Sequence, residues 1–194
     1  MPEYFVMIAA REPRFATIHK HNDALADFTA PALGRALGDA WPDGLEYRMA
    51  ANKPGIEIAD LIPNTLGYTM MSDRLKTLIA KTSKSKVEWL RFKLLNHKGR
   101  KAADDLWVAN VLTMVDAVDR DRTIGEPYPA KPEWYLVTDQ LYIKPEKVKP
   151  ELDLFRLGEM PRRIIVRDDL KAAIESEKMT GALFHPMGAK VELR

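Results

Sequence analysis

The chain contains no cysteine among its 194 residues, which excludes disulfides, thiolate metal sites and cysteine nucleophiles. No stretch reaches about 18 consecutive apolar residues, so we expect no membrane-spanning segment and no membrane partner. The 10 glycines form neither a GxGxxG nor a Walker-type phosphate loop, and no GxSxG hydrolase motif is present. The net charge of only +2 gives no argument for nucleic acid as a partner.

A secretion signal is not expected either. The first apolar run, residues 4–10, follows the acidic Glu3, has no basic segment before it and is short for a signal peptide. We interpret residues 3–10 as a first β-strand, and we expect a soluble cytoplasmic protein. The hydrophobic content of 46% and charged content of 30% are ordinary for a globular chain.

The length predicts a single domain over residues 1–194. Residues 1–44 are its poorly defined part, because five breakers interrupt them: Pro31, Gly34, Gly38, Pro42 and Gly44. We expect only helical fragments there, at 23–28 and 32–37.

The C-terminal stretch 154–187 predicts a strand, a helix and a strand. Residues 164–166 are a β-branched run typical of a buried strand. Asp168 and Asp169 follow, where acidic side chains favour a starting helix. The apolar residues of 170–174 recur at helical spacing, and a glycine break then precedes the apolar run 182–184.

The same pattern occurs earlier in the chain. Residues 69–79 align without gaps on residues 164–174, with identities at four positions: Asp73/Asp168, Leu75/Leu170, Lys76/Lys171 and Ile79/Ile174. The alignment predicts two similar strand–helix–strand units, and the alternative is a chance match of two ordinary units. Strands outnumber helices, so we expect an α+β fold with a mixed, mainly antiparallel sheet and a few helices.

Other segments complete the predicted element order. Gly99 suits the tip of a hairpin, because glycine readily adopts positive φ. The prolines at 127, 129 and 132 predict an irregular loop over 125–133. Further strands are predicted at 87–95, 106–112, 134–143 and 190–193.

Few residues suggest a metal site or catalysis. His19 and His21 lie near Asp23, but no third strong ligand is close, so we interpret them as loop histidines and expect no metal and no cofactor. Asp116 and Asp119 are candidates for a small hydrolase or a ligand-binding regulator, since paired carboxyls can act as acid and base. A turn balanced by neighbouring arginines is the preferred interpretation.

One segment is strongly basic. Between Lys81 and Lys101 there are eight Lys or Arg residues and one acid, Glu88. Such a segment can dock an acidic partner, or its lysines can protect a strand edge from aggregation. The candidate partner-binding residues are Lys84, Lys86, His97, Lys98, Arg100 and Lys101.

Four segments together resemble immunity protein family eleven of bacterial polymorphic toxin systems, formerly a domain of unknown function. They are 69–76, 87–100, 106–119 and 154–184, and the most characteristic is the ending LFRL…IIV…LK…TGALF. The resemblance covers about residues 45–187, whereas residues 1–44 match no pattern of the family.

The resemblance implies an antidote that is not an enzyme. It would bind a cognate toxin or effector, delivered by a contact-dependent or type VI secretion route, and the sequence leaves open whether it forms a homo-oligomer. Trp107 stands where the family pattern suggests tyrosine, and Arg167 replaces a helix-capping serine. The family's recurring residues, each either scaffold or contact surface, are Asn110, Asp116, Asp119, Phe155, Arg156 and Gly181.

Overall fold

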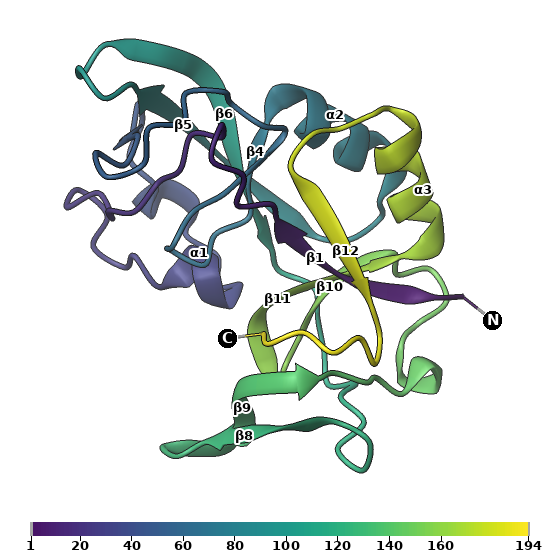
Figure 1. Cartoon of the computed structure of the whole chain (residues 1–194). Coiled ribbons are helices and arrows are strands. Elements are labelled where there is room, and N and C mark those ends of the chain that lie inside the picture. The colour runs from purple at the N-terminus through teal and green to yellow at the C-terminus, as the bar shows by residue number, and fades with distance from the viewer. Residues whose placement is uncertain (1, 194) are drawn as a thin grey trace.

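The computed structural model describes residues 2–193 and has an α+β fold (Figure 1). One five-stranded sheet has the order β12–β1–β11–β10–β7, and the other has the order β2–β5–β6–β4–β3. All their strand pairs are antiparallel except β7 with β10 and β2 with β5. A separate two-stranded ribbon, β8–β9, completes the β-structure. The predicted fold class is confirmed.

The bounds of the elements follow, sheet by sheet. The first sheet contains β1 (Tyr4–Ala9), β7 (Met114–Val115), β10 (Leu154–Leu157), β11 (Met160–Arg167) and β12 (Ala182–Pro186). The second contains β2 (Glu46–Arg48), β3 (Leu61–Ile62), β4 (Met70–Ser72), β5 (Val87–Leu95) and β6 (Lys101–Val111), and the ribbon contains β8 (Ile124–Tyr128) and β9 (Lys131–Gln140). The helices are α1 (Ala30–Leu33), α2 (Asp73–Thr82) and α3 (Asp168–Ser176), with 3₁₀ turns η1 (Gly38–Ala40) and η2 (Pro145–Lys147).

The two segments with similar sequences have the same local topology. β4, α2 and β5 run strand, helix, strand, with β6 lying between the two strands. β11, α3 and β12 do the same, with β1 between them. The two helices pack side by side (Figure 1). Whether the two units are a true repeat or a chance match of two ordinary units is not decided by this topology, so the repeat stays a prediction.

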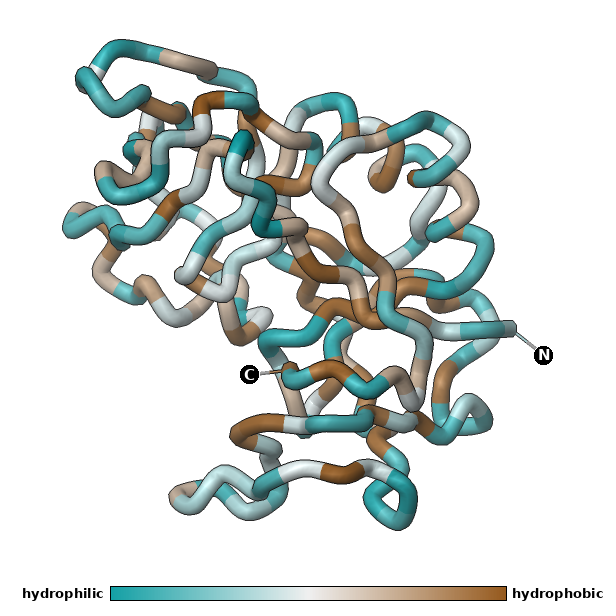
Figure 2. The backbone as a smooth tube through the Cα atoms, in the orientation of Figure 1, coloured by the Kyte–Doolittle hydropathy of each residue, from teal (hydrophilic) through white to brown (hydrophobic). Residues whose placement is uncertain are grey.

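The hydrophobic core joins the sheets through these helices. A cluster of buried side chains connects both sheets with α2 and α3, and hydrophobic segments gather toward the middle of the molecule (Figure 2). The helical spacing explains the cluster, because Leu75 and Ile79 of α2 are buried, as are Leu170 and Ile174 of α3. Two further large clusters lie on the other sides of the sheets, and a small one contains Ala10, Phe15 and Ala59.

The helix starts differ as the sequence indicates. Ser72 caps α2, since its Oγ accepts a hydrogen bond from the Leu75 N–H at 3.2 Å. Arg167 precedes α3 and provides no side-chain cap. Instead, Asp169 accepts the Leu170 N–H at 2.9 Å and pairs with Arg167 at 2.6 Å. An acidic first turn thus compensates for the missing cap.

Three local predictions were wrong. Residues 125–133 are not an irregular loop, because most of them belong to the β8–β9 hairpin. The ribbon is exposed and its register is interrupted three times, so prolines at 127 and 132 fit without breaking a central ladder. In the N-terminal part the helix is Ala30–Leu33 rather than 32–37, and residues 23–28 form turns. The expected strand at 190–193 is only an isolated bridge between Thr138 and Leu193.

Candidate functional site

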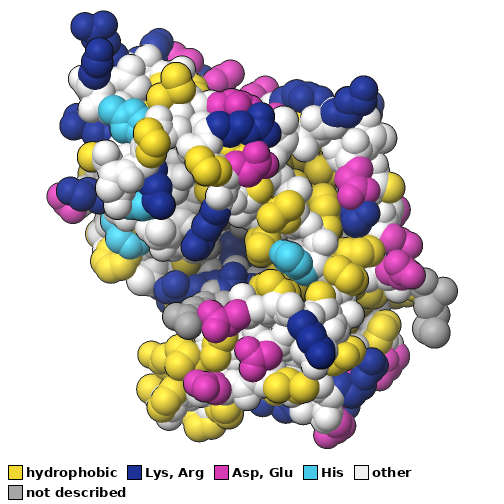
Figure 3. Space-filling view, viewed as in Figure 1, with side chains coloured by type: hydrophobic (Ala, Val, Ile, Leu, Met, Phe, Trp, Pro, Cys, Tyr) yellow, Lys and Arg dark blue, Asp and Glu magenta, His cyan; other side chains and the backbone are white. Residues whose placement is uncertain are grey.

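The tip of the β5–β6 hairpin carries part of the predicted basic surface. The Asn96 side-chain oxygen accepts the N–H groups of Lys98 at 2.9 Å and Arg100 at 3.0 Å. Gly99 has a φ of 74°, as the sequence predicts for a hairpin tip. These bonds fix the turn, so the exposed side chains of Lys98 and Arg100 project from a rigid base. Figure 3 shows Lys and Arg side chains gathered at this upper-left end of the molecule.

Neighbouring groups modify the charge of the tip. Lys101 forms an ion pair with Asp104 at 2.7 Å, so its charge is partly neutralised. The imidazole Nε2 of His97 lies 2.8 Å from the Lys53 carbonyl oxygen and ties the tip to a neighbouring loop. The Arg48 guanidinium lies against Gly99, because β2 pairs with β5 in parallel. Local sequence gave no signal for Arg48, which the chain brings to the tip from another strand.

Lys84 and Lys86 do not belong to this cluster. Both precede β5, whereas the tip follows it. Nine extended residues separate the two places, which corresponds to about 30 Å at the usual rise of a strand. The six predicted residues therefore form two separate basic positions, one at each end of β5.

A groove of about 740 Å³ lies beside the hairpin, between the loop 38–44 and the outer face of β5. Trp89, Arg91 and Lys93 line it, since alternate residues of a strand share one face. Trp41 closes the opposite side, and its indole N–H donates to the Arg91 carbonyl oxygen at 2.8 Å. Trp41 lies outside the predicted set, because its loop is about fifty residues away in sequence. Tryptophan and arginine are the residue types that dominate protein interfaces.

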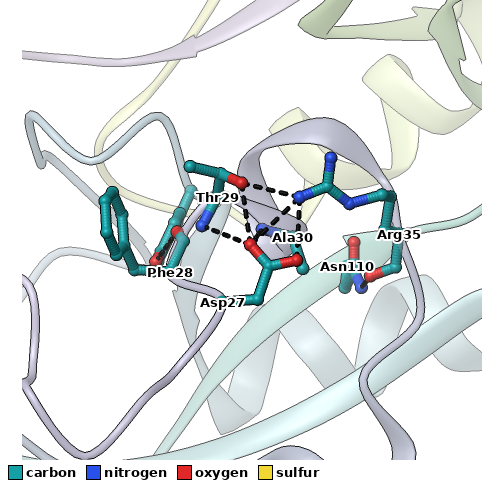
Figure 4. Close-up of polar contacts among 7 residues, drawn as sticks. Asp27, Phe28, Thr29, Ala30, Arg35 and Asn110 are labelled. Atoms are coloured by element: carbon teal, nitrogen blue, oxygen red, sulfur yellow. Dashed lines mark hydrogen bonds and ion pairs between the residues drawn. The ribbon is translucent and has the colours of Figure 1, made fainter.

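Glu88 and Asn110 hold the loop that forms one wall of the groove. The Glu88 carboxylate accepts the Gly38 N–H at 2.7 Å and the Asn110 side-chain amide at 2.9 Å. Burial raises the pKa of Glu88, but the hydrogen bonds from Gly38, Asn110 and Leu37 outweigh burial and leave this pKa below its usual range. The Asn110 amide also donates to the Arg35 carbonyl oxygen at 2.8 Å (Figure 4). One acid and one amide thus fix a loop of otherwise irregular structure.

The turn before α1 forms its own polar network. The Asp27 carboxylate accepts the Thr29 hydroxyl at 2.8 Å and the Thr29 N–H at 3.1 Å (Figure 4). It also pairs with Arg35 at 2.8 Å. The bonds from Thr29 and Arg35 lower the pKa of Asp27. This N-terminal segment, which the sequence left undefined, is ordered by side chains rather than by regular structure.

Arg156 anchors the same N-terminal segment by hydrogen bonds to α1. Its side chain is fully buried, and no carboxylate is among its hydrogen-bond partners in the described residues. The guanidinium donates to backbone carbonyls only: Val111 at 2.8 Å, Ala32 at 3.0 Å, Pro31 at 2.8 Å and Pro161. Burial lowers the pKa of Arg156 to about 10, so the group stays charged at neutral pH. A buried cation held by carbonyls joins α1 to β6 and β11.

The other recurring family residues also serve the scaffold. Phe155 is fully buried. Gly181 has a φ of 78°, and a Cβ there would lie 2.5 Å from the Leu61 carbonyl oxygen. Only glycine fits such a position without strain. Together with Asn110 and Arg156, these positions are explained by packing and not by a contact surface.

Asp119 and His21 hold local structure. Asp119 is 9% exposed, accepts the Asp121 N–H at 3.2 Å and lies 3.8 Å from the Lys144 ammonium. The Asp116 carboxylate lies against Gly158. Neither lines the groove beside the hairpin. The ring of His21 packs on Phe28, with centroids 4.4 Å apart.

Comparisons with known proteins place the chain in a family. No helix among residues 2–193 is long and apolar enough to cross a membrane. A search of curated proteins found no match. The model of the Immunity protein family (Imm11) matches residues 6–189, so it includes the N-terminal segment that the predicted extent of 45–187 left out. With nearly its whole length matched, the chain belongs to the Immunity protein family (Imm11).

Proposed function

We propose that this chain binds a cognate bacterial toxin and neutralises it by protein–protein contact. Membership of the Immunity protein family (Imm11) carries the proposal, since such proteins are generally not enzymes and are expected to bind a toxin. The toxin would reach the cell by a contact-dependent or type VI secretion route. Of the two carboxylates of the alternative hydrolase hypothesis, Asp119 accepts a turn N–H from Asp121 and Asp116 lies against Gly158, and neither lines the groove beside the hairpin.

The β5–β6 face is the surface that we propose for toxin binding, defined as the hairpin tip together with the adjacent groove. The tip carries Arg48, Lys98 and Arg100 without an ion pair among the described residues. Exposed charges of one sign accelerate encounter with an oppositely charged partner. The groove adds the partly exposed Trp89, whose apolar ring can supply affinity, whereas Trp41 is 9% exposed and serves as a wall of the groove. The tip would steer the toxin, and the groove would hold it.

The first experiment is a rescue test. The C-terminal domain of the large reading frame next to this gene is expressed in a sensitive host, with and without this protein. We expect restored growth and co-purification of the two proteins. A toxic neighbour that this protein neither binds nor neutralises would refute the pairing.

Charge reversal then tests the surface. We expect the double variant Lys98→Glu, Arg100→Glu to lower the association rate at least about tenfold at low salt, and less at high salt. Lys101→Glu should have a smaller effect, because Lys101 is already paired with Asp104.

The matched control is Lys147→Glu, Lys149→Glu, which changes the charge equally at exposed positions outside this face. An equal loss in this control would mean that net charge, and not the tip, governs association. Lys84→Glu, Lys86→Glu tests the separate basic position before β5 in the same assay. Unchanged affinity and rate in the tip variant would remove the tip from the proposed interface.

A further inference from the structure

A second concave site lies between the two sheets. It has a volume of about 480 Å³ and is lined by the end of β1, the segment around β3 and β4, β11 and the C-terminal residues. Three arginines line it, Arg11, Arg162 and Arg163, against a single acid, Glu192, in the described lining. Figure 3 shows Lys and Arg side chains around a hollow near the middle of this face. The cleft is therefore positively charged, and it is separate from the β5–β6 face.

Arg163 is the most constrained of the three. Its Nε is buried and has no hydrogen-bond partner among the described residues. Burial, together with the smaller effects of the charges of Arg162 and Arg11, lowers the pKa of Arg163 to about 10. At neutral pH the guanidinium is still charged, so a cation with an unused donor lies in a partly dry site. Such a group is costly unless a counter-charge reaches it.

The neighbours of Arg163 leave room for that counter-charge. The Arg162 side chain lies against Gly67, where a Cβ would approach its Cδ and Nη1 to 3.6 Å. Gly67 has a φ of 75°, and its lack of a side chain keeps this wall open. Leu183 is 45% exposed and provides an apolar wall. The site thus combines converging cations with an apolar surface, as small-ligand sites commonly do.

We propose that this cleft between the sheets binds an oxyanion, a carboxylate or a phosphate, at the guanidinium groups of Arg162 and Arg163. Arginine presents paired N–H donors that match the two oxygens of such a group. The bound anion would place a counter-charge beside the guanidinium of Arg163 and offset the repulsion among three like charges. Two sources can supply it: a free small anion, or an acidic side chain of the toxin. The first source is independent of the proposed function, and the second rests on it.

The first arm uses free anions. Inorganic phosphate and citrate are titrated into the purified protein in a calorimeter, at constant ionic strength. We expect saturable binding that weakens at least about tenfold in Arg162→Gln, Arg163→Gln, because each removed guanidinium removes a charge-assisted bond. Arg122→Gln, which removes one exposed cation outside the cleft, is the control and should bind as the wild type does. Because Arg163 is partly buried, the exposed pair Arg11→Gln, Arg162→Gln provides a second variant whose folding is not at risk.

The second arm uses the toxin domain. If phosphate and citrate do not bind but the cleft variants weaken toxin binding tenfold, while Arg122→Gln does not, the anion is an acidic side chain of the toxin. Toxin binding that is normal in every cleft variant, together with no anion binding, overturns the inference and leaves the proposed function intact. Failure of the wild type to bind the toxin refutes the proposed function. The titration with phosphate and citrate then decides by itself whether the cleft binds an oxyanion.

Discussion

Replacing Arg156 with methionine tests whether the buried cation organises the N-terminal segment. Methionine keeps much of the length and apolar volume of the side chain but removes every donor. Four backbone carbonyls then lose their partner, two of them in α1 at Pro31 and Ala32. The carbonyl oxygens of so short a helix have few other hydrogen-bond donors, because the last carbonyls of any helix have no partner within the helix.

The magnitude follows from two opposing contributions. Hydrogen bonds from a charged donor contribute about 1.5–3 kcal/mol each, so four of them stabilise by roughly 6–12 kcal/mol. Keeping the guanidinium out of water costs several kcal/mol, and methionine removes that cost. We therefore expect Arg156→Met to lower the free energy of unfolding by about 3–5 kcal/mol, a large part of the 5–15 kcal/mol that domains usually have.

Urea denaturation measures the loss, and hydrogen exchange locates it. Amide protection should fall most in residues 29–38, which Arg156 and its neighbours hold. Arg156→Lys keeps the charge but has fewer, differently placed donors, so its loss should be intermediate. Arg100→Met, at the exposed tip, should stay within about 0.5 kcal/mol of the wild type. If the free energy of unfolding of Arg156→Met lies within about 1 kcal/mol of the wild-type value, the cost of burying the guanidinium cancels the gain from its hydrogen bonds. The argument that Arg156 anchors the segment would then be wrong.

Two further predictions concern the scaffold. In urea denaturation, Gly181→Ala should lower the free energy of unfolding more than Gly38→Ala does. Both positions have a positive φ, which costs alanine about 1–2 kcal/mol. Of the two, only Gly181 has a backbone atom 2.5 Å from the new Cβ. Equal losses would show that the close approach to Leu61 relaxes freely. The depressed pKa of Glu88 makes its contribution complete above the ordinary carboxyl pKa and lost as pH falls through the folded value. Stability should therefore decrease on acidification in the wild type and less in Glu88→Gln, and parallel curves for the two proteins would contradict this.

Sequence patterns predicted the elements that local residues determine. The periodicity around Leu170 and Ile174 and the acidic start at Asp168 correspond to α3, and the β-branched run before it lies in β11. The hairpin tip at Gly99 is likewise set by its own turn residues. These features depend on side chains only a few positions apart, so the sequence alone is sufficient for them.

Features that local sequence patterns do not determine were missed. A proline-rich segment became β8–β9 because an exposed two-stranded ribbon tolerates residues that a central sheet excludes. Trp41 lines the groove because its own indole N–H bonds to Arg91 and because Glu88 and Asn110 hold its loop, and these partners are about fifty or more residues away. The six basic residues were grouped by sequence proximity, although β5 places them at its two ends. Pairing across fifty or more residues leaves no periodic signal in one sequence.

The support of the groove by buried residues gives a last prediction about Asn110. The variant Asn110→Asp places a second carboxylate where an amide now donates to Glu88 at 2.9 Å. Two adjacent carboxylates repel at neutral pH, so the loop 35–44 should lose protection from hydrogen exchange, and toxin affinity should fall because a wall of the groove moves.

Acidification should act with opposite sign in the two proteins. In Asn110→Asp a proton shared between the two carboxylates restores a hydrogen bond, so protection of the loop should rise as pH falls through the raised pKa of the pair. In the wild type, acidification protonates Glu88, so its carboxyl group accepts the hydrogen bonds of the loop less well and the loop should loosen. Protection factors corrected for intrinsic exchange, measured from about pH 4 to pH 8 across the usual carboxyl range, decide between the signs. A loop equally protected in both proteins at every pH would mean that Glu88 and Asn110 do not determine its position, and that buried family residues do not control the groove.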